Sequence, residues 1–179
     1  ELKYVERVKK GHGYLIRVTD EGFSTVKKMS EFLYLALNSS PGKVHFSGTL
    51  VSGMGEGKYY MSLDGYRKQF EKKIGYIPFP GTLNIRIVDP LSLENREKIE
   101  SFRYHFVDGF SDSKRTYGWV KCYPVILNGN EKIKSDLLIL ERTHHDTNML
   151  EIIAPVNIKK ALNLKNGDNV KITLKPSDN

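Results

Sequence analysis

Cysteine and long apolar runs are almost missing from this sequence. Cys122 is the only cysteine among 179 residues, which excludes an internal disulfide framework and favours a reducing compartment. It lies in the apolar run GWVKCYPVIL, where we expect it to be buried as a small hydrophobe. No apolar run approaches the roughly 20 residues that span a bilayer, and the first residues, ELKYVERVKKG, lack the apolar stretch of a signal peptide. These absences favour a globular cytoplasmic protein with no membrane partner.

The balance of charge is basic. The formal net charge is +7 at pH 7, and the excess is spread along the chain rather than gathered in a tail. Such a surface suits an anionic partner, either a nucleic acid or a nucleotide, and does not choose between them.

Residues 1–40 differ in pattern from the rest. Two short strands joined at a glycine turn are followed by Thr19 and Asp20, which can cap a helix. The helix shows an apolar stripe made of Phe23, Val26, Leu33 and Leu37. Hairpin and helix together resemble the last part of a winged helix-turn-helix domain. The first residue is glutamate, so we expect the chain to be cut or processed and the recognition helix to be absent. DNA binding and a simple packing appendage both stay open for this segment.

Residues 41–179 form the second predicted domain, after the turn-rich break Asn38–Gly42. Short strands dominate it, with a few short helices between them, which predicts a mainly β fold built on a small barrel. Strands are expected at 43–53, 59–63, 82–88, 102–109, 115–127, 135–142, 150–155 and 169–174. Helices are expected at 65–75, within 92–102 and at 158–164.

The segment SGMGEGKYY, residues 52–60, carries glycine at every second position. Glycines weaken a strand, so their repetition suggests a backbone that a ligand approaches closely. Exposed N–H groups together with the charge of Lys58 are the chemistry of a phosphate cradle. The spacing fits neither GxxxxGK[ST] nor GxGxxG, and a flexible hairpin turn is the plain alternative.

The segment PGTLN places Thr82 and Asn84 two residues apart on a predicted strand. Both side chains therefore project from one face, opposite Leu83 and Ile85. A hydroxyl and an amide carbonyl are oxygen ligands of the kind that Mg²⁺ accepts, although both are neutral and need a phosphate to supply charge. Turn-capping by the same two residues is the alternative.

The segment ERTHHDTNMLEIIAP, residues 141–155, holds two further candidates. The pair His144 and His145 invites a zinc interpretation, but no further cysteine or histidine stands at ligand spacing. Glu151 lies in the apolar run MLEIIAP, where a carboxylate is costly unless it is paired. It is a candidate general base, or else an outward-facing residue of an edge strand.

Together these motifs resemble the archaeal CTP-dependent riboflavin kinases. The resemblance is carried by SGMGEGKYYMS, by PFPGTLNI, and by EIIAP followed by LNLKNGDNVKI, in this order from about Gly42 to Lys175. It implies a six-stranded-type cradle-loop β-barrel, preceded here by the winged-helix remnant. It also implies transfer of the γ-phosphoryl group of CTP to the 5′-hydroxyl of riboflavin, giving FMN and CDP.

The resemblance assigns roles to residues of this chain by their place in the motifs. A nucleotide-binding loop is implied at Met54, Gly55, Glu56, Gly57, Lys58 and Tyr59, and a second nucleotide contact at Val156, Asn157, Ile158 and Lys159. Thr82 and Asn84 are implied as Mg²⁺ ligands, and Thr143 and Glu151 as contacts to the flavin. Glu151 would also be the catalytic base. Residues 144–148 depart from the family pattern, which puts their contacts in doubt.

Two other functions stay open from the sequence. One is a DNA-binding transcriptional regulator with a flavin- or nucleotide-sensing barrel, supported by residues 1–40 and by the final run NLKNGDNVKITL, which resembles swapped-hairpin barrel transcription factors. The other is a flavin-binding protein without catalysis. The swapped-hairpin barrel factors are short and lack a glycine-rich loop followed by a Thr-x-Asn pair.

Overall fold

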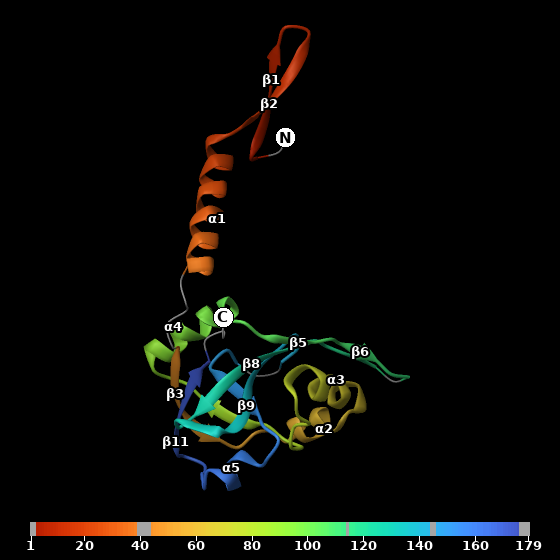
Figure 1. Cartoon of the computed structure of the whole chain (residues 1–179), viewed down its shortest axis with the longest axis vertical. Helices are drawn as coiled ribbons and strands as arrows, with labels where there is room; N and C mark the ends of the chain where they lie inside the picture. The colour runs from red at the N-terminus through yellow and green to blue at the C-terminus, as the bar shows by residue number, and fades with distance from the viewer. Residues whose placement is uncertain (1–2, 39–43, 114, 144–145, 176–179) are drawn as a thin grey trace. The chain divides into compact units, whose positions relative to one another are not determined.

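The computed structural model describes residues 3–38, 44–113, 115–143 and 146–175 (Figure 1). The chain divides into two compact units, Glu1–Gly42 and Lys43–Asn179. No helix in the described part of the chain is long and apolar enough to cross a membrane.

The first unit contains the predicted hairpin and helix. Strands β1 (Val5–Lys10) and β2 (Gly13–Val18) pair antiparallel, and helix α1 runs over Asp20–Asn38. The Thr19 hydroxyl accepts a hydrogen bond from the Gly22 N–H at 3.0 Å, as expected of a helix cap. The assignment of this unit as a winged-helix remnant stays a prediction.

The second unit is built on a closed antiparallel barrel of six strands, which confirms the predicted fold class. Its strands are β3 (His45–Val51), β4 (Leu83–Arg86), β8 (Val120–Leu127), β9 (Asn130–Leu140), β10 (Met149–Ile153) and β11 (Asn169–Leu174). They follow the order β11-β3-β4-β10-β9-β8, and β8 pairs with β11 to close the barrel. Closure leaves no free edge among these strands, so β10, which carries Glu151, is an inner strand between β4 and β9.

Alternate residues of the strands fill the barrel. Leu83 and Ile85 of β4, Leu150 and Ile152 of β10, and Leu137 of β9 belong to one buried cluster. The residues between them point to the outer side of the sheet, because successive side chains of a strand alternate.

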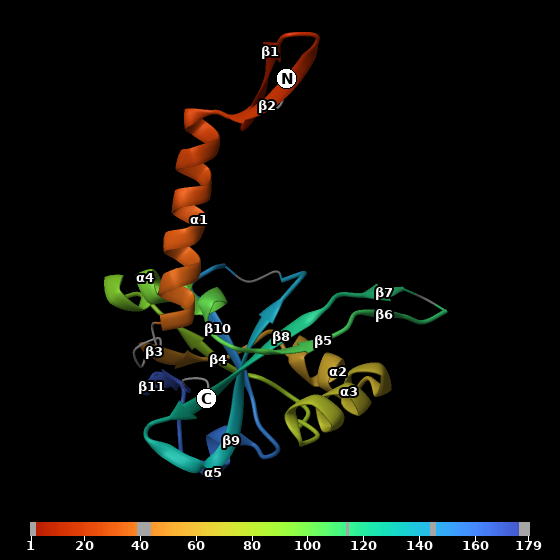
Figure 2. The same cartoon turned by 45° about the horizontal axis from the view of Figure 1, so that its top comes forward.

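Helices and short strands cover part of that outer side. Helices α2 (Glu56–Ser62) and α3 (Asp64–Ile74) lie beside the strand β5 (His105–Val107) and the hairpin of β6 (Phe110–Ser111) and β7 (Thr116–Tyr117) (Figures 1 and 2). A second buried cluster, which includes Phe70, Tyr66, Met61 and Cys122, joins these elements to the barrel. Helix α4 (Pro90–Lys98) with the 3₁₀ turn η1 (Ile99–Ser101), and the short helix α5 (Ile158–Ala161), complete the unit.

One predicted element is wrong. The run 59–63 was expected as a strand, and the structure places most of it in α2. Gly55, with φ 87°, turns the chain into the helix, and Leu63, in extended conformation, separates α2 from α3. Met61 is buried, whereas Lys58 and Ser62 are exposed. Only one face of α2 therefore packs against the rest of the unit.

Single residues end one helix and cap another, and the expected burial of Cys122 is confirmed. Gly75 ends α3 in the left-handed conformation, with φ 77°. The Asn157 side chain caps α5 by accepting the Lys160 N–H at 3.1 Å. Cys122 is fully buried in an apolar cluster, and burial raises the pKa of its thiol, which keeps it protonated and unreactive.

Candidate functional site

A cavity of about 710 Å³ lies outside the barrel, between the sheet face of β4, β10, β9 and β8 and the elements that cover it. The segment 53–58 with α2 lines one side, and the chain from 115 to 120 lines another. Its volume is in the range of pockets that hold cofactor-sized molecules.

The floor of this cavity changes in chemistry from strand to strand. Asn84 of β4 is the paired neighbour of Glu151 of β10, and Glu151 is in turn paired with Leu138 of β9. Side chains paired in this way share a face and stand about 5 Å apart. The floor therefore runs from an amide, through a carboxylate, to an apolar wall that Leu138 and Leu140 form.

Thr82 and Asn84 lie together at the polar end. The Thr82 hydroxyl donates to the Asn84 side-chain oxygen at 3.1 Å, and Asn84 is only 5% exposed although it is polar. The sequence prediction that these side chains share a face is thus confirmed in geometry. Two oxygens that occupy neighbouring positions around an octahedral Mg²⁺ stand about 3.0 Å apart, since each Mg–O distance is about 2.1 Å. The spacing and donor chemistry of the pair fit such an ion.

The alternating glycines make room for this pair. A Cβ at Gly53 would overlap the Asn84 side-chain nitrogen. A Cβ at Gly57 would stand 2.7 Å from the Thr82 hydroxyl oxygen and 3.1 Å from the Thr82 backbone nitrogen. Close approach of the glycine segment to β4 therefore explains two of the three glycines, whereas Gly55 serves the turn into α2.

Five of the six residues predicted for the nucleotide loop line the cavity. They are Met54, Gly55, Glu56, Gly57 and Lys58. The sixth, Tyr59, is outside this lining, and its hydroxyl lies 2.9 Å from the hydroxyl of Tyr117. Thr143, predicted as a flavin contact, also lines the cavity together with Glu151.

The second predicted nucleotide segment lines a smaller, adjoining pocket. Val156, Asn157, Ile158 and Lys159 surround a space of about 90 Å³ together with Phe79 and Ala154. Gly81 and Thr82 line both pockets. The structure therefore brings the two predicted nucleotide segments, which lie about a hundred residues apart in sequence, to either side of Thr82.

Sequence reasoning missed the aromatic side of the cavity. Tyr60, Tyr66, Tyr117 and Trp119 line it, and so do the basic residues Arg115 and Arg142. The Tyr66 hydroxyl donates to the Gly118 carbonyl at 2.6 Å, and burial raises the pKa of Tyr66 to about 12. The local sequence KRTYGW contains basic and aromatic residues, but no pattern in it predicts that they line a cavity.

The described residues contain no cluster of three or more histidine, cysteine or carboxylate side chains that could hold a metal ion. His144 and His145, the pair that invited a zinc interpretation, lie outside them.

Comparisons with known proteins agree with these features. The family model of CTP-dependent riboflavin kinases, described as "Domain of unknown function DUF120", matches residues 50–174. A riboflavin kinase of Cenarchaeum symbiosum is 41% identical over 95% of this chain and 86% of its own length. Riboflavin kinases of Methanocella arvoryzae and Pyrobaculum aerophilum are 38% and 40% identical, over 96% and 90% of this chain and 75% and 74% of their own lengths. These comparisons indicate a kinase and give no support for a DNA-binding regulator. The chain belongs to the family of CTP-dependent riboflavin kinases.

Proposed function

We propose that the cavity beside β4 and β10 is the site where the chain transfers the γ-phosphoryl group of CTP to the 5′-hydroxyl of riboflavin. The observation that carries this proposal is the floor on which Glu151 stands between the Thr82–Asn84 pair and the apolar wall of β9. An anionic triphosphate suits the first end, and a planar ring system suits the second, so that the acceptor hydroxyl falls beside the carboxylate.

The nucleotide would occupy the polar end and the adjoining small pocket. The backbone of residues 53–57 and the Lys58 ammonium line the place for the phosphates. Val156–Lys159 line the small pocket, whose volume of about 90 Å³ suits a single ring better than a fused pair. This division places Thr82 at the junction, where phosphates and base-bearing sugar would meet.

Mg²⁺ is the cofactor that we propose for the Thr82–Asn84 pair. When bound, the ion would neutralise charge on the phosphate oxygens. Two neutral oxygens bind such an ion weakly by themselves, so we expect it to enter together with the nucleotide.

Glu151 is the proposed base. As the 5′-oxygen of riboflavin forms its bond to phosphorus, the bond from phosphorus to the bridging oxygen breaks and CDP leaves with the electron pair. The hydroxyl proton passes to the Glu151 carboxylate. Because phosphoryl transfer depends chiefly on position and charge, the carboxylate also acts by orienting the hydroxyl.

The test is to incubate the protein with riboflavin, Mg²⁺ and each of CTP, ATP, GTP and UTP, and to measure FMN by chromatography. We expect FMN with CTP alone. No FMN with any nucleotide would refute the proposal, and salt-sensitive DNA binding in the absence of FMN formation would favour the regulator.

Two variants test the assigned roles. Glu151→Gln should leave CTP binding nearly intact and lower turnover by about 10²-fold or more. Thr82→Val keeps the shape but removes an oxygen, and should raise the Mg²⁺ concentration needed for half-maximal turnover. Unchanged turnover in the first variant, or an unchanged Mg²⁺ requirement in the second, would remove that residue from its role.

A further inference from the structure

Arg115 directly precedes β7 and lines the same cavity as the Thr82–Asn84 pair. Its guanidinium lies 4.7 Å from the ring centre of Tyr117, 5.0 Å from that of Tyr59 and 5.6 Å from that of Tyr60. The rings come from two separate elements, since Tyr59 and Tyr60 belong to α2 and Tyr117 to β7. Three rings from two elements hold this one side chain at the edge of the cavity.

Such contacts use only part of the hydrogen-bonding capacity of a guanidinium. A side-chain hydrogen bond to Tyr117 raises the pKa of Arg115 and takes up part of its donor fork. The attraction acts between the charge and the faces of the rings, whereas the five N–H donors lie in the plane of the group. The ion pairs found among the described residues do not include Arg115. The arrangement therefore keeps a permanent positive charge and the remaining donors of the fork available to a ligand.

Hydrogen bonds with Asp112 hold the backbone of Arg115. The Arg115 N–H donates to the Asp112 carboxylate at 2.9 Å, and the Asp112 N–H donates to the Arg115 carbonyl at 3.0 Å. The Tyr117 hydroxyl donates to the other Asp112 oxygen at 2.9 Å. Phe110 stacks on Tyr117, with ring centres 4.6 Å apart. One carboxylate thus ties together the backbone of Arg115 and one of the rings that hold its side chain.

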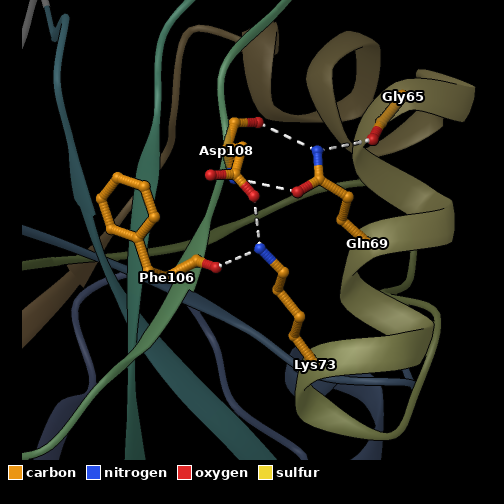
Figure 3. Close-up of polar contacts among 5 residues, drawn as sticks. All are labelled: Gly65, Gln69, Lys73, Phe106 and Asp108. Atoms are coloured by element: carbon orange, nitrogen blue, oxygen red, sulfur yellow. Dashed lines mark hydrogen bonds and ion pairs between the residues drawn. The ribbon is translucent and has the colours of Figure 1, made fainter.

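Helix α3 anchors the chain that leads into this hairpin (Figure 3). The Gln69 side chain accepts the Asp108 N–H at 2.9 Å and donates to the Asp108 carbonyl at 2.9 Å. The Lys73 ammonium donates to the Asp108 carboxylate at 2.5 Å and to the Phe106 carbonyl at 2.6 Å. A Cβ at Gly65 would stand 2.6 Å from the Phe110 ring, so the hairpin rests directly on the first turn of α3. The position of Arg115 therefore depends on elements that are fixed to the barrel.

The charges around the cavity indicate what Arg115 can bind. Among the described residues, its lining contains three basic side chains, Lys58, Arg115 and Arg142, and two acidic ones, Glu56 and Glu151. A nucleoside triphosphate brings several negative charges, and the negative charge on the phosphoryl group in transit has to be neutralised from several sides. Lys58 belongs to the glycine side of the cavity, and Arg142 donates to the Thr116 carbonyl at 3.5 Å. Among the described residues of the β6–β7 hairpin, Arg115 is the cation that lines the cavity.

We propose that Arg115 is a catalytic residue that binds the transferred phosphoryl group from the hairpin side of the cavity, and that Tyr59, Tyr60 and Tyr117 position its guanidinium. The inference rests on the proposed kinase function and adds to it a group that the family motifs do not contain. Contact with three rings and bidentate binding of a phosphoryl group together favour arginine, so we expect that lysine cannot replace it.

The test compares Arg115→Gln and Arg115→Lys with the wild type in FMN formation from CTP and riboflavin. Arg115→Gln should lower kcat by about 10²- to 10³-fold, the usual loss when one donor to a developing charge is removed. Arg115→Lys should lose at least about tenfold because the donor fork is gone. The KM for riboflavin and the Kd for CDP should stay within threefold of the wild type. Arg67→Gln on α3 removes an arginine outside the cavity lining and should behave as the wild type.

A binding measurement separates this role from a structural one. CDP with aluminium fluoride and riboflavin imitates the phosphoryl group in transit, and its affinity should fall strongly in Arg115→Gln, whereas the affinity for CDP alone should not. Equal weakening of both ligands, together with a lower melting temperature, would overturn the proposal. So would a kcat within threefold of the wild type, or a loss that resides wholly in the KM for riboflavin. A wild type that forms no FMN with any nucleotide would refute the kinase function itself, before Arg115 is tested.

Discussion

Replacing Gly57 by alanine perturbs the candidate site through a single methyl group. The added Cβ would stand 2.7 Å from the Thr82 hydroxyl oxygen, 2.9 Å from its methyl carbon and 3.1 Å from its backbone nitrogen. Because one of these neighbours is backbone, rotation of the Thr82 side chain alone does not remove the crowding. Segment 53–57 and the start of β4 therefore have to separate.

The required movement can be worked out from these distances. Non-bonded heavy atoms settle at about 3.5 Å, so the two segments must separate by about 0.4 Å to clear the backbone nitrogen and by about 0.8 Å to clear the hydroxyl oxygen. Thr82 then moves relative to Asn84, whose side-chain oxygen it now meets at 3.1 Å. A misplacement of about 1 Å at a reacting centre costs about 10²-fold in rate, so we expect kcat/KM to fall by about 30- to 100-fold.

The assay is FMN formation from CTP and riboflavin over a range of Mg²⁺ concentrations. Gly57→Ala should lose rate and need more Mg²⁺, while circular dichroism shows a folded barrel. Gly13→Ala in the first unit is the matched control, because the nearest atom to its added Cβ is 4.0 Å away. If Gly57→Ala kept a rate within threefold of the wild type at every Mg²⁺ concentration, the glycine would not be serving the Thr82–Asn84 pair.

Three further predictions concern stability. Ile85→Ala empties a fully buried position in the barrel and should lower the free energy of unfolding by about 2–5 kcal/mol in urea titrations. Burial raises the pKa of Tyr66 to about 12, so the folded protein favours the protonated hydroxyl. The free energy of unfolding should stay constant up to about pH 10 and fall as pH rises towards 12. The fall should be less steep in Tyr66→Phe. A pH dependence that Tyr66→Phe leaves unchanged would contradict this reasoning. The hydrogen bond from Lys73 lowers the pKa of the Asp108 carboxyl. The contact between Lys73 and Asp108 should therefore be present at neutral pH and be lost as pH falls through that lowered pKa. Hydrogen exchange at the Asp108 amide, compared with an Asp108→Asn control, would reveal the loss.

Much of the fold followed from local pattern. The barrel strands and α3 could be predicted from local residue patterns, because such patterns depend on residues close together in sequence. The strand predicted at 59–63 was wrong because contacts with distant residues decide the structure there. Its aromatic and apolar residues suit a strand, and only the turn at Gly55 and the packing of Met61 against α3 and β8 make it helical.

The candidate site divides in the same way. The pairing of Thr82 with Asn84 is a two-residue relation on one strand, and the sequence by itself determined it. That Glu151 is their neighbour depends on the register of β10 against β4, which join segments more than sixty residues apart. No local pattern encodes that register, since it results from closing the whole barrel.

The sequence by itself determined the family, the order of the motifs and the alternation of core and cleft residues along the strands. Only the tertiary structure decided what the glycines are for and which residues complete the cavity. Gly53 and Gly57 are required by the approach of another segment to their backbone, and Arg115 faces the cavity because α2, α3 and the β6–β7 hairpin pack together around three tyrosine rings. Both effects arise from contacts between distant segments, and these contacts exist only once the chain has folded.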